Sequence, residues 1–122
     1  KYAKQKYNCD FIFVTKFPFA ARPFYHMLDE DGLTNSYDLL FKGIEITTGA
    51  QREHRVDILR KQMIEKDVNP ESLEFYLDFF KYGCPPHGGF AIGIARIMMQ
   101  IFELDNIREA TFIYRGPTRL NP

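Results

Sequence analysis

The chain has few cysteines and no excess of charge of either sign. It has 122 residues, of which two are cysteines, and sixteen basic residues balance sixteen acidic ones. Cys9 and Cys84 lie far apart and neither has a CxxC partner, so their spacing is not that of a metal site. We expect them to be reduced thiols of a cytosolic protein. Zero net charge argues against a broad basic surface for nucleic acid, although a phosphate site needs only a few cations.

Long apolar runs and repeats are missing too. No run approaches the ~18 residues that a membrane helix needs, and the first ten residues lack the apolar stretch of a signal peptide. The chain has no internal repeat and no low-complexity segment. An apolar content of 45%, with 12 Phe and 7 Tyr, is enough for the packed core of one domain or part of one. Because Lys1 opens directly into foldable sequence, we expect a part of a longer protein.

The apolar pattern predicts an α+β fold, with helices packed on an antiparallel sheet. Strands are expected at Asp10–Thr15 and at Ala110–Tyr114, where β-branched and aromatic residues cluster. Tyr37–Lys42 and Ile44–Thr48 are two further β-prone runs with one glycine between them. That glycine predicts a bent strand, or one long strand with a bulge.

Three segments have the character of helices. Apolar residues three and four apart predict an amphipathic helix over Ala50–Lys66. A second helix is expected over 70–82, with Asn69 as its N-cap and proline at its first position. The glycine- and proline-rich Gly83–Gly89 predicts a loop. The strongly apolar Ile92–Phe102 that follows it predicts a helix buried on most sides.

The first candidate site combines carboxylates, a hydroxyl and a guanidinium. Asp38, Glu45 and Thr48 offer the oxygen ligands that Mg²⁺ prefers. Arg52 comes directly after the tripeptide GAQ. Alternation along a strand points Glu45 and Thr48 to opposite faces, so a bend would be needed to bring them together. The plainer alternative, and the commoner one on residue types alone, is that Glu45 is a sheet residue in a salt bridge with Arg52.

The second candidate site is the glycine-rich loop and helix from Gly83 to Arg96. Glycines at a helix start, followed by one arginine on an apolar helix, suit a polyphosphate. A lone charge on such a helix is costly unless paired, so Arg96 binds either a buried carboxylate or a ligand anion. His87 in the same loop contacts a ligand or, more commonly for a loop histidine, braces the turn.

Four blocks, taken in order, resemble the aspartyl-tRNA synthetases, most closely those of the archaeal and eukaryotic type. GAQR, within the second block, is weak evidence alone, but the four blocks together cover nearly the whole chain. The third block resembles class II motif 3. The blocks are RPFYHM (Arg22–Met27), SYDLLFKGIEITTGAQREHR (Ser36–Arg55), PPHGGFAIGIAR (Pro85–Arg96) and NIREATFIYRGPTRLNP (Asn106–Pro122).

The resemblance implies an antiparallel sheet flanked by helices, and activation of aspartate with ATP before transfer to tRNA. It implies that Glu45 and Thr48 hold Mg²⁺ and the ATP phosphates. Arg52 matches the arginine that pairs with the side-chain carboxylate of aspartate. Arg96 matches the motif 3 arginine at the γ-phosphate, and Gly93 a glycine under the nucleotide.

Two further positions match less closely. Asp38 is similar to an acidic residue that precedes the metal-binding glutamate, and His87 to a histidine near the amino acid. For the intact protein the resemblance also implies a homodimer in the cytoplasm, with aspartate, ATP and tRNA as partners and no membrane.

The chain departs from the family pattern in several places. Thr48 stands where serine is usual, which keeps the hydroxyl, whereas Ala91 and Ala95 replace a glycine and a glutamate of motif 3. The tail differs at Tyr114, Gly116 and Asn121. Motifs 1 and 2, which build the dimer interface and bind the α-phosphate, lie upstream in the family and are absent. We therefore expect a C-terminal portion of a catalytic domain, inactive alone, with an exposed apolar edge and a tendency to self-associate.

Three alternatives stay open at this point. An asparaginyl-tRNA synthetase shares the fold and much of motif 3, although RPFY and GAQR favour the aspartyl branch. Ala91 and Ala95 favour a synthetase-derived module that binds a nucleotide or a partner without catalysis. The last alternative is a synthetase-like ligase that forms asparagine by amidation, with ammonia in place of tRNA as the acceptor.

Overall fold

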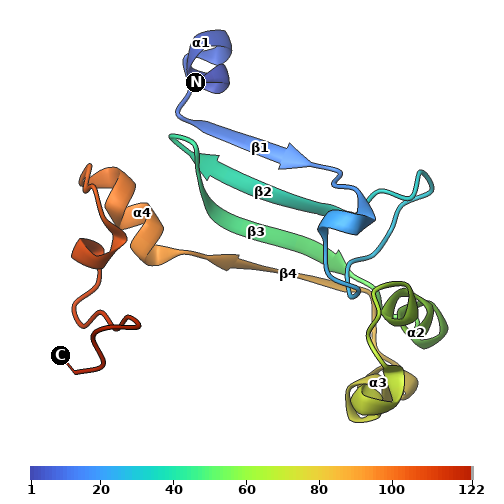
Figure 1. The fold of residues 1–122 in the computed structure, drawn as a ribbon. Coiled ribbons are helices and arrows are strands. Elements are labelled where there is room, and N and C mark those ends of the chain that lie inside the picture. Colours follow the sequence, from blue (N-terminus) through green and yellow to red (C-terminus); the bar gives the residue numbers. More distant parts are fainter. Residues whose placement is uncertain (122) are drawn as a thin grey trace. The chain divides into compact units, whose positions relative to one another are not determined.

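A computed structural model describes residues 1–121 of the chain. Its four strands form one sheet in the order β1-β2-β3-β4, and successive strands run in opposite directions (Figure 1). This confirms the predicted α+β class with an antiparallel sheet. The strands are β1 (Phe11–Thr15), β2 (Ser36–Phe41), β3 (Ile44–Arg52) and β4 (His87–Ile92).

Short helices lie between and around these strands. The described chain has three 3₁₀ turns: η1 (Phe19–Ala21) between β1 and β2, η2 (Pro70–Leu73) just before α3, and η3 (Ile107–Ala110) after α4. The α-helices are α1 (Tyr2–Tyr7), α2 (Val56–Glu65), α3 (Glu74–Lys81) and α4 (Ile94–Ile101).

The chain divides into two compact units, and every strand runs from one into the other. The first unit contains the chain up to Phe13, then Leu39–Thr47, then everything from Ile92 onward. The second contains Val14–Asp38 and Thr48–Ala91.

The best-packed core belongs to the second unit. Leu59 and Met63 of α2 and Leu77 of α3 are fully buried against one another. The predicted N-cap at Asn69 is confirmed: its side chain accepts a hydrogen bond from the backbone N–H of Glu71 at 3.0 Å. The first turn is 3₁₀ and the α-helix begins at residue 74. Partly buried residues that surround this core are Phe24, Tyr25, Val68, Leu73, Tyr76 and Phe80.

The prediction of one bent or bulged strand around Gly43 is wrong. The two runs are separate strands, β2 and β3, which pair as a hairpin through Lys42 and Gly43. Both turn residues have positive φ, 47° at Lys42 and 93° at Gly43. Positive φ at both central residues is the mark of the type I′ turn that suits the twist of a two-residue hairpin, and it explains the glycine.

Two predicted boundaries near the end of β3 and the start of β4 are also wrong. α2 begins at Val56, not Ala50, because β3 continues to Arg52, which bridges to His26. The chain then turns around Glu53, whose buried carboxylate accepts hydrogen bonds from the backbone N–H groups of His54 and Arg55. The predicted loop Gly83–Gly89 ends early, since β4 begins at His87.

The last two elements differ from expectation as well. The helix predicted over Ile92–Phe102 exists as α4, but only Met99 of it is buried, since no other described element covers its remaining faces. Ile94 is 70% exposed, and Phe90 and Ile92 of β4 are also exposed, which confirms the expected apolar surface. Residues 110–114 form no strand: Ala110 ends η3 and 111–114 follow it. Residues 115–121 are irregular, as predicted, apart from an isolated bridge between Gly116 and Arg119.

Candidate functional site

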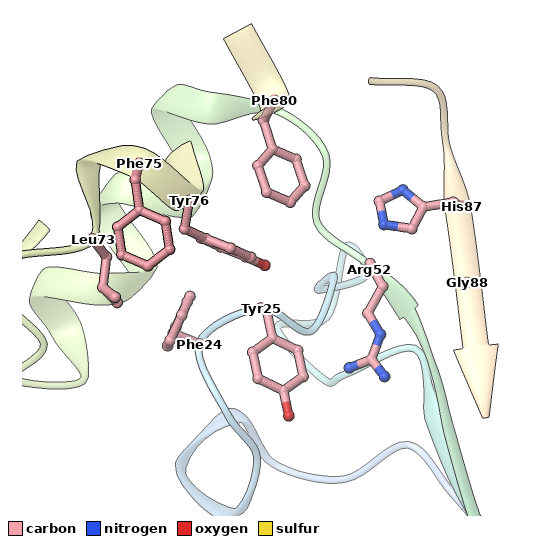
Figure 2. A pocket seen from close by; sticks show the side chains of 9 residues that line it. All are labelled: Phe24, Tyr25, Arg52, Leu73, Phe75, Tyr76, Phe80, His87 and Gly88. Atoms are coloured by element: carbon pink, nitrogen blue, oxygen red, sulfur yellow. The ribbon is translucent and has the colours of Figure 1, made fainter. Parts of the chain in front are cut away.

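A cavity of about 520 Å³ opens in the second unit. Figure 2 shows aromatic side chains from α3 and from the loop before β2 on one side, and side chains of β3 and β4 on the other. Arg52 and His87, both candidates from the sequence, line this cavity together. The remaining lining residues are Phe24, Tyr25, Leu73, Phe75, Tyr76, Phe80 and Gly88.

Arg52 is the cation of this cavity. Its guanidinium carbon lies 4.6 Å from the centre of the Tyr25 ring (Figure 2). Arg52 is partly buried, and within residues 1–121 its side chain takes part in no salt bridge or side-chain hydrogen bond. The predicted alternative, a salt bridge from Arg52 to Glu45, is wrong, because Glu45 pairs with Arg96. A partly buried cation with free N–H groups is suited to an anionic ligand.

His87 stands opposite Phe80 at the edge of the same cavity. Its Nδ1 lies 3.0 Å from the carbonyl oxygen of Pro85 and 3.6 Å from the thiol sulfur of Cys84. A carbonyl oxygen only accepts, so Nδ1 carries the proton and donates. In the neutral ring, Nε2 is then an acceptor. The hydrogen bond to Pro85 is the turn-bracing contact that the sequence allowed for this histidine, and the ring also lines the cavity.

Asp38 and Thr48 meet in the hairpin of β2 and β3. Thr48 Oγ1 donates to Asp38 Oδ1 at 2.6 Å, and Arg22 forms a 2.7 Å ion pair with Asp38 Oδ2. Arg22 also stacks on Phe17, with its guanidinium carbon 3.7 Å from the ring centre. Both oxygens of Asp38 are therefore engaged within the protein, and the carboxylate charge is balanced by an arginine. Thr48 Oγ1 also accepts a hydrogen bond from Arg22 NH1 at 3.5 Å, so this hydroxyl is engaged on both sides within the protein.

Glu45 and Arg96 pair with each other in the first unit. Arg96 NH1 donates to the backbone carbonyl of Glu45 at 2.9 Å and to its Oε1 at 3.2 Å. Both side chains are close to half-exposed. Of the two partners that the sequence allowed for Arg96, a carboxylate is the one seen, although it is not buried.

Gly93 joins α4 to β3 at close range. Its N–H donates to the carbonyl of Ile46 at 2.7 Å, and a Cβ at this position would meet the Arg96 side chain at 3.3 Å. Glycine therefore lets the start of α4 approach β3 without displacing Arg96. The glycines at 88 and 89 lie in β4 and not at the helix start, so the predicted glycine-rich loop in front of α4 is wrong.

His26 was not a sequence candidate, yet it lies buried beside the cavity residues. Its ring contacts Tyr25 edge-on at 5.2 Å, and its carbonyl accepts from the side-chain amide of Gln62 at 2.8 Å. Burial, then the positive charges of Arg52 and Arg22, lower its pKa to about 4, and Asp38 opposes them. The imidazole is therefore neutral near pH 7. A histidine after RPFY carries no signal of burial in the sequence, which is why it was missed.

Residues 1–121 contain neither a metal-binding cluster nor a membrane-spanning helix. No group of three His, Cys, Asp or Glu side chains in this range has the geometry to hold a metal ion. No helix in the same range has the length and apolarity to cross a membrane. Cys9 and Cys84 are free thiols.

Comparison with known families identifies the chain. Residues 1–114 match the family model described as tRNA synthetases class II (D, K and N). The chain belongs to this family. Among curated relatives, the chain is 48% identical to the aspartate–tRNA(Asp/Asn) ligases of Aeropyrum pernix and of Thermus thermophilus. It is 44% identical to the aspartate–tRNA(Asp) ligase of Pyrococcus furiosus.

Solved structures of this family separate two branches. An aspartyl-tRNA synthetase from Entamoeba histolytica is 48% identical and superposes with a TM-score of 0.94 over 99% of this chain. An asparaginyl-tRNA synthetase from Pyrococcus horikoshii is 34% identical, with a TM-score of 0.84 over 92%. The likeness favours the aspartyl branch, and the sequence resemblance to that family is confirmed.

The chain is much shorter than these relatives. It spans 28% of the Aeropyrum ligase, 29% of the Thermus ligase and 25% of the Entamoeba synthetase chain.

Proposed function

We propose that this chain is the motif 3 portion of the catalytic domain of an aspartate–tRNA ligase. In the intact protein, an oxygen of the aspartate α-carboxylate attacks the α-phosphorus of ATP. The bond to pyrophosphate breaks and aspartyl-adenylate forms. A ribose hydroxyl at the 3′ end of tRNA then attacks the acyl carbon, and AMP leaves. Identity of 44–48% to aspartate–tRNA ligases supports this reaction.

The unpaired Arg52 is the observation that carries the proposal. Its guanidinium faces a cavity and rests on Tyr25, so its orientation is restrained without a competing carboxylate. Two parallel N–H groups pair with both oxygens of an aspartate side chain. Asparagine has the same shape but no charge, and would leave a desolvated cation uncompensated. The charge of Arg52 is therefore the feature that selects aspartate.

His87 provides a second contact of fitting chemistry. Because Nδ1–H of His87 donates to the carbonyl oxygen of Pro85, Nε2 of the neutral ring can accept a hydrogen bond. The α-ammonium group of an amino acid is a donor, so we assign His87 to that group and Arg52 to the carboxylate of the side chain.

Arg96 and Glu45 are assigned to the nucleotide. Arg96 has further N–H groups beyond the one that Glu45 occupies, and it is exposed enough to reach a phosphate. In the same proposal Gly93 keeps the start of α4 close to β3, so that Arg96 is held in place. Its N–H is already used by Ile46, so Gly93 acts on the nucleotide through position and not by donating to it.

The sequence resemblance assigns Mg²⁺ to Glu45 and Thr48, and each of these residues offers an oxygen donor of the right kind. Carboxylate and hydroxyl oxygens are the hard ligands that Mg²⁺ accepts while it keeps several waters. Thr48 donates to Asp38 and accepts from Arg22 NH1 at 3.5 Å, so a cation at this hydroxyl would have to displace the Arg22 contact. Asp38, neutralised by Arg22, is better suited to orient Thr48 than to bind the ion directly. When bound with ATP, the ion would neutralise phosphate charge.

Aspartate activation by the intact protein that contains this chain tests the proposal. Arg52→Leu should lower the rate of aspartate-dependent pyrophosphate exchange, expressed as kcat/KM, by at least ~100-fold, since stranding a charged partner costs ~3–5 kcal/mol. Lys61→Ala, a change at an exposed residue of α2, is the matched control and should leave the rate unchanged. A rate for Arg52→Leu within about threefold of the unaltered protein contradicts the assignment.

A further inference from the structure

The cavity around Arg52 is larger and more apolar than aspartate requires. About 520 Å³ is typical of sites for drug-sized ligands, whereas aspartate has only four carbons. Arg52 and His87 lie on the strand side, and the opposite walls carry no charged group (Figure 2). A ligand that only paired with Arg52 would leave those walls in contact with water.

The opposite walls are a connected set of aromatic rings. Tyr76 lies edge-on to Phe80 with ring centres 4.9 Å apart, and edge-on to Phe24 at 6.2 Å. Phe24 in turn contacts Tyr25, the ring that supports Arg52, at 5.4 Å. Aromatic side chains favour offset and edge-on partners, so this set offers several good contacts to one more ring.

Phe75 adds an exposed wall. It lines the cavity although 67% of its surface is open to water. Burying an aromatic side chain beneath a ligand ring is favourable. Phe79, one turn further along α3, is similarly exposed at 74% but does not line the cavity. The two residues therefore form a matched pair for an experiment.

The polar atoms at the boundary suit an anion. Burial raises the pKa of the Tyr76 phenol, while the positive charge of Arg52 opposes that shift. The phenol therefore keeps its proton at neutral pH and can donate a hydrogen bond. No acidic side chain lines the cavity in the described chain, so a carboxylate meets a cation and a donor there without repulsion.

We propose that this cavity binds aryl carboxylates, with the carboxylate on the Arg52 guanidinium and the aromatic ring among Phe24, Tyr76 and Phe80. The ring half is a subsite that aspartate does not fill, so an aryl carboxylate competes with aspartate for Arg52. The inference shares one residue with the proposed function, but it concerns a different class of ligand.

Calorimetric titration of the intact protein that contains this chain with 3-phenylpropionate tests this binding. The uncharged 3-phenylpropanamide and the ring-free dianion succinate are the comparison ligands. The acid should bind with a millimolar or tighter Kd, at least ~10-fold tighter than either comparison ligand. The amide lacks the charge-assisted pair with Arg52, and succinate lacks the ring contacts. Absence of acid binding up to ~10 mM, or equal affinity for acid and amide, overturns the proposal.

Variants assign the two halves of the ligand. Arg52→Gln should reduce the preference for acid over amide to less than ~2-fold, which measures the guanidinium contact. Phe75→Ser should weaken acid binding at least ~3-fold, whereas Phe79→Ser on the same helix should leave it unchanged. Equal losses for the two serine variants overturn the cavity assignment. No titration contains ATP or aspartate, so failure here leaves the aspartate test of Arg52 unaffected.

Discussion

Tyr25 is predicted to fix the affinity for aspartate through its contact with Arg52. The guanidinium carbon lies 4.6 Å from the ring centre, within the range of a favourable cation–π contact. Such contacts are worth about 0.5–2 kcal/mol, so Tyr25→Leu should raise the KM for aspartate by about 2- to 30-fold in the intact protein. Tyr25→Phe keeps the ring and should stay within about twofold of the unaltered protein.

The assay is pyrophosphate exchange with aspartate or ATP varied in turn. If the ring acts by positioning Arg52, the KM for aspartate rises while the KM for ATP does not change. A variant that merely loosens the fold would lower kcat and the amount of active protein without this selectivity. Equal changes in both KM values, or a loss of affinity in Tyr25→Phe as large as in Tyr25→Leu, would refute the positioning argument.

Three further predictions concern the folded chain. Leu77→Ala should lower the free energy of unfolding by ~2–5 kcal/mol in urea titrations, because this fully buried leucine packs on Leu59 and Met63; a loss below ~1 kcal/mol would mean that the helix pair is not the core. Gly43→Val should cost ~1–2 kcal/mol in the same titration, since φ is 93° at this turn, and a neutral effect would contradict the type I′ hairpin. The pKa of His26 is about 4 in the folded chain, against about 6.5 in the unfolded chain. The free energy of unfolding should therefore keep the full contribution of the neutral imidazole above pH 6.5 and fall by up to about 3 kcal/mol as the pH drops toward 4. His26→Gln should flatten that part of the pH–stability profile, and an unchanged slope would disprove the buried neutral imidazole.

Local sequence signals located most of the elements. The β-branched and aromatic run before Thr15, the apolar spacing of Leu59 and Met63, and the Asn69–Pro70 start all correspond to observed structure, because each is a short-range preference. The hairpin at Gly43 was missed because a single glycine between β-prone runs permits a bulge or a turn. Only the pairing of β2 with β3 decides between them.

Side-chain partners were harder to predict than elements. The sequence predicts Arg52, Arg96 and Glu45 as site candidates. Whether Arg52 or Arg96 pairs with Glu45 depends on which residues the fold brings together. The exposure of α4 also has a physical reason, since its apolar faces require contacts that no other described residue provides. Residue type alone predicts burial for such a helix.

The most direct test is aspartate-dependent pyrophosphate exchange by the intact protein, measured with aspartate and with asparagine. The account predicts exchange with aspartate, none with asparagine, and a loss of at least ~100-fold with Arg52→Leu while Lys61→Ala remains fully active. Exchange with asparagine that equals or exceeds exchange with aspartate, or an Arg52→Leu protein that retains its rate, would contradict the central claim that this guanidinium selects aspartate.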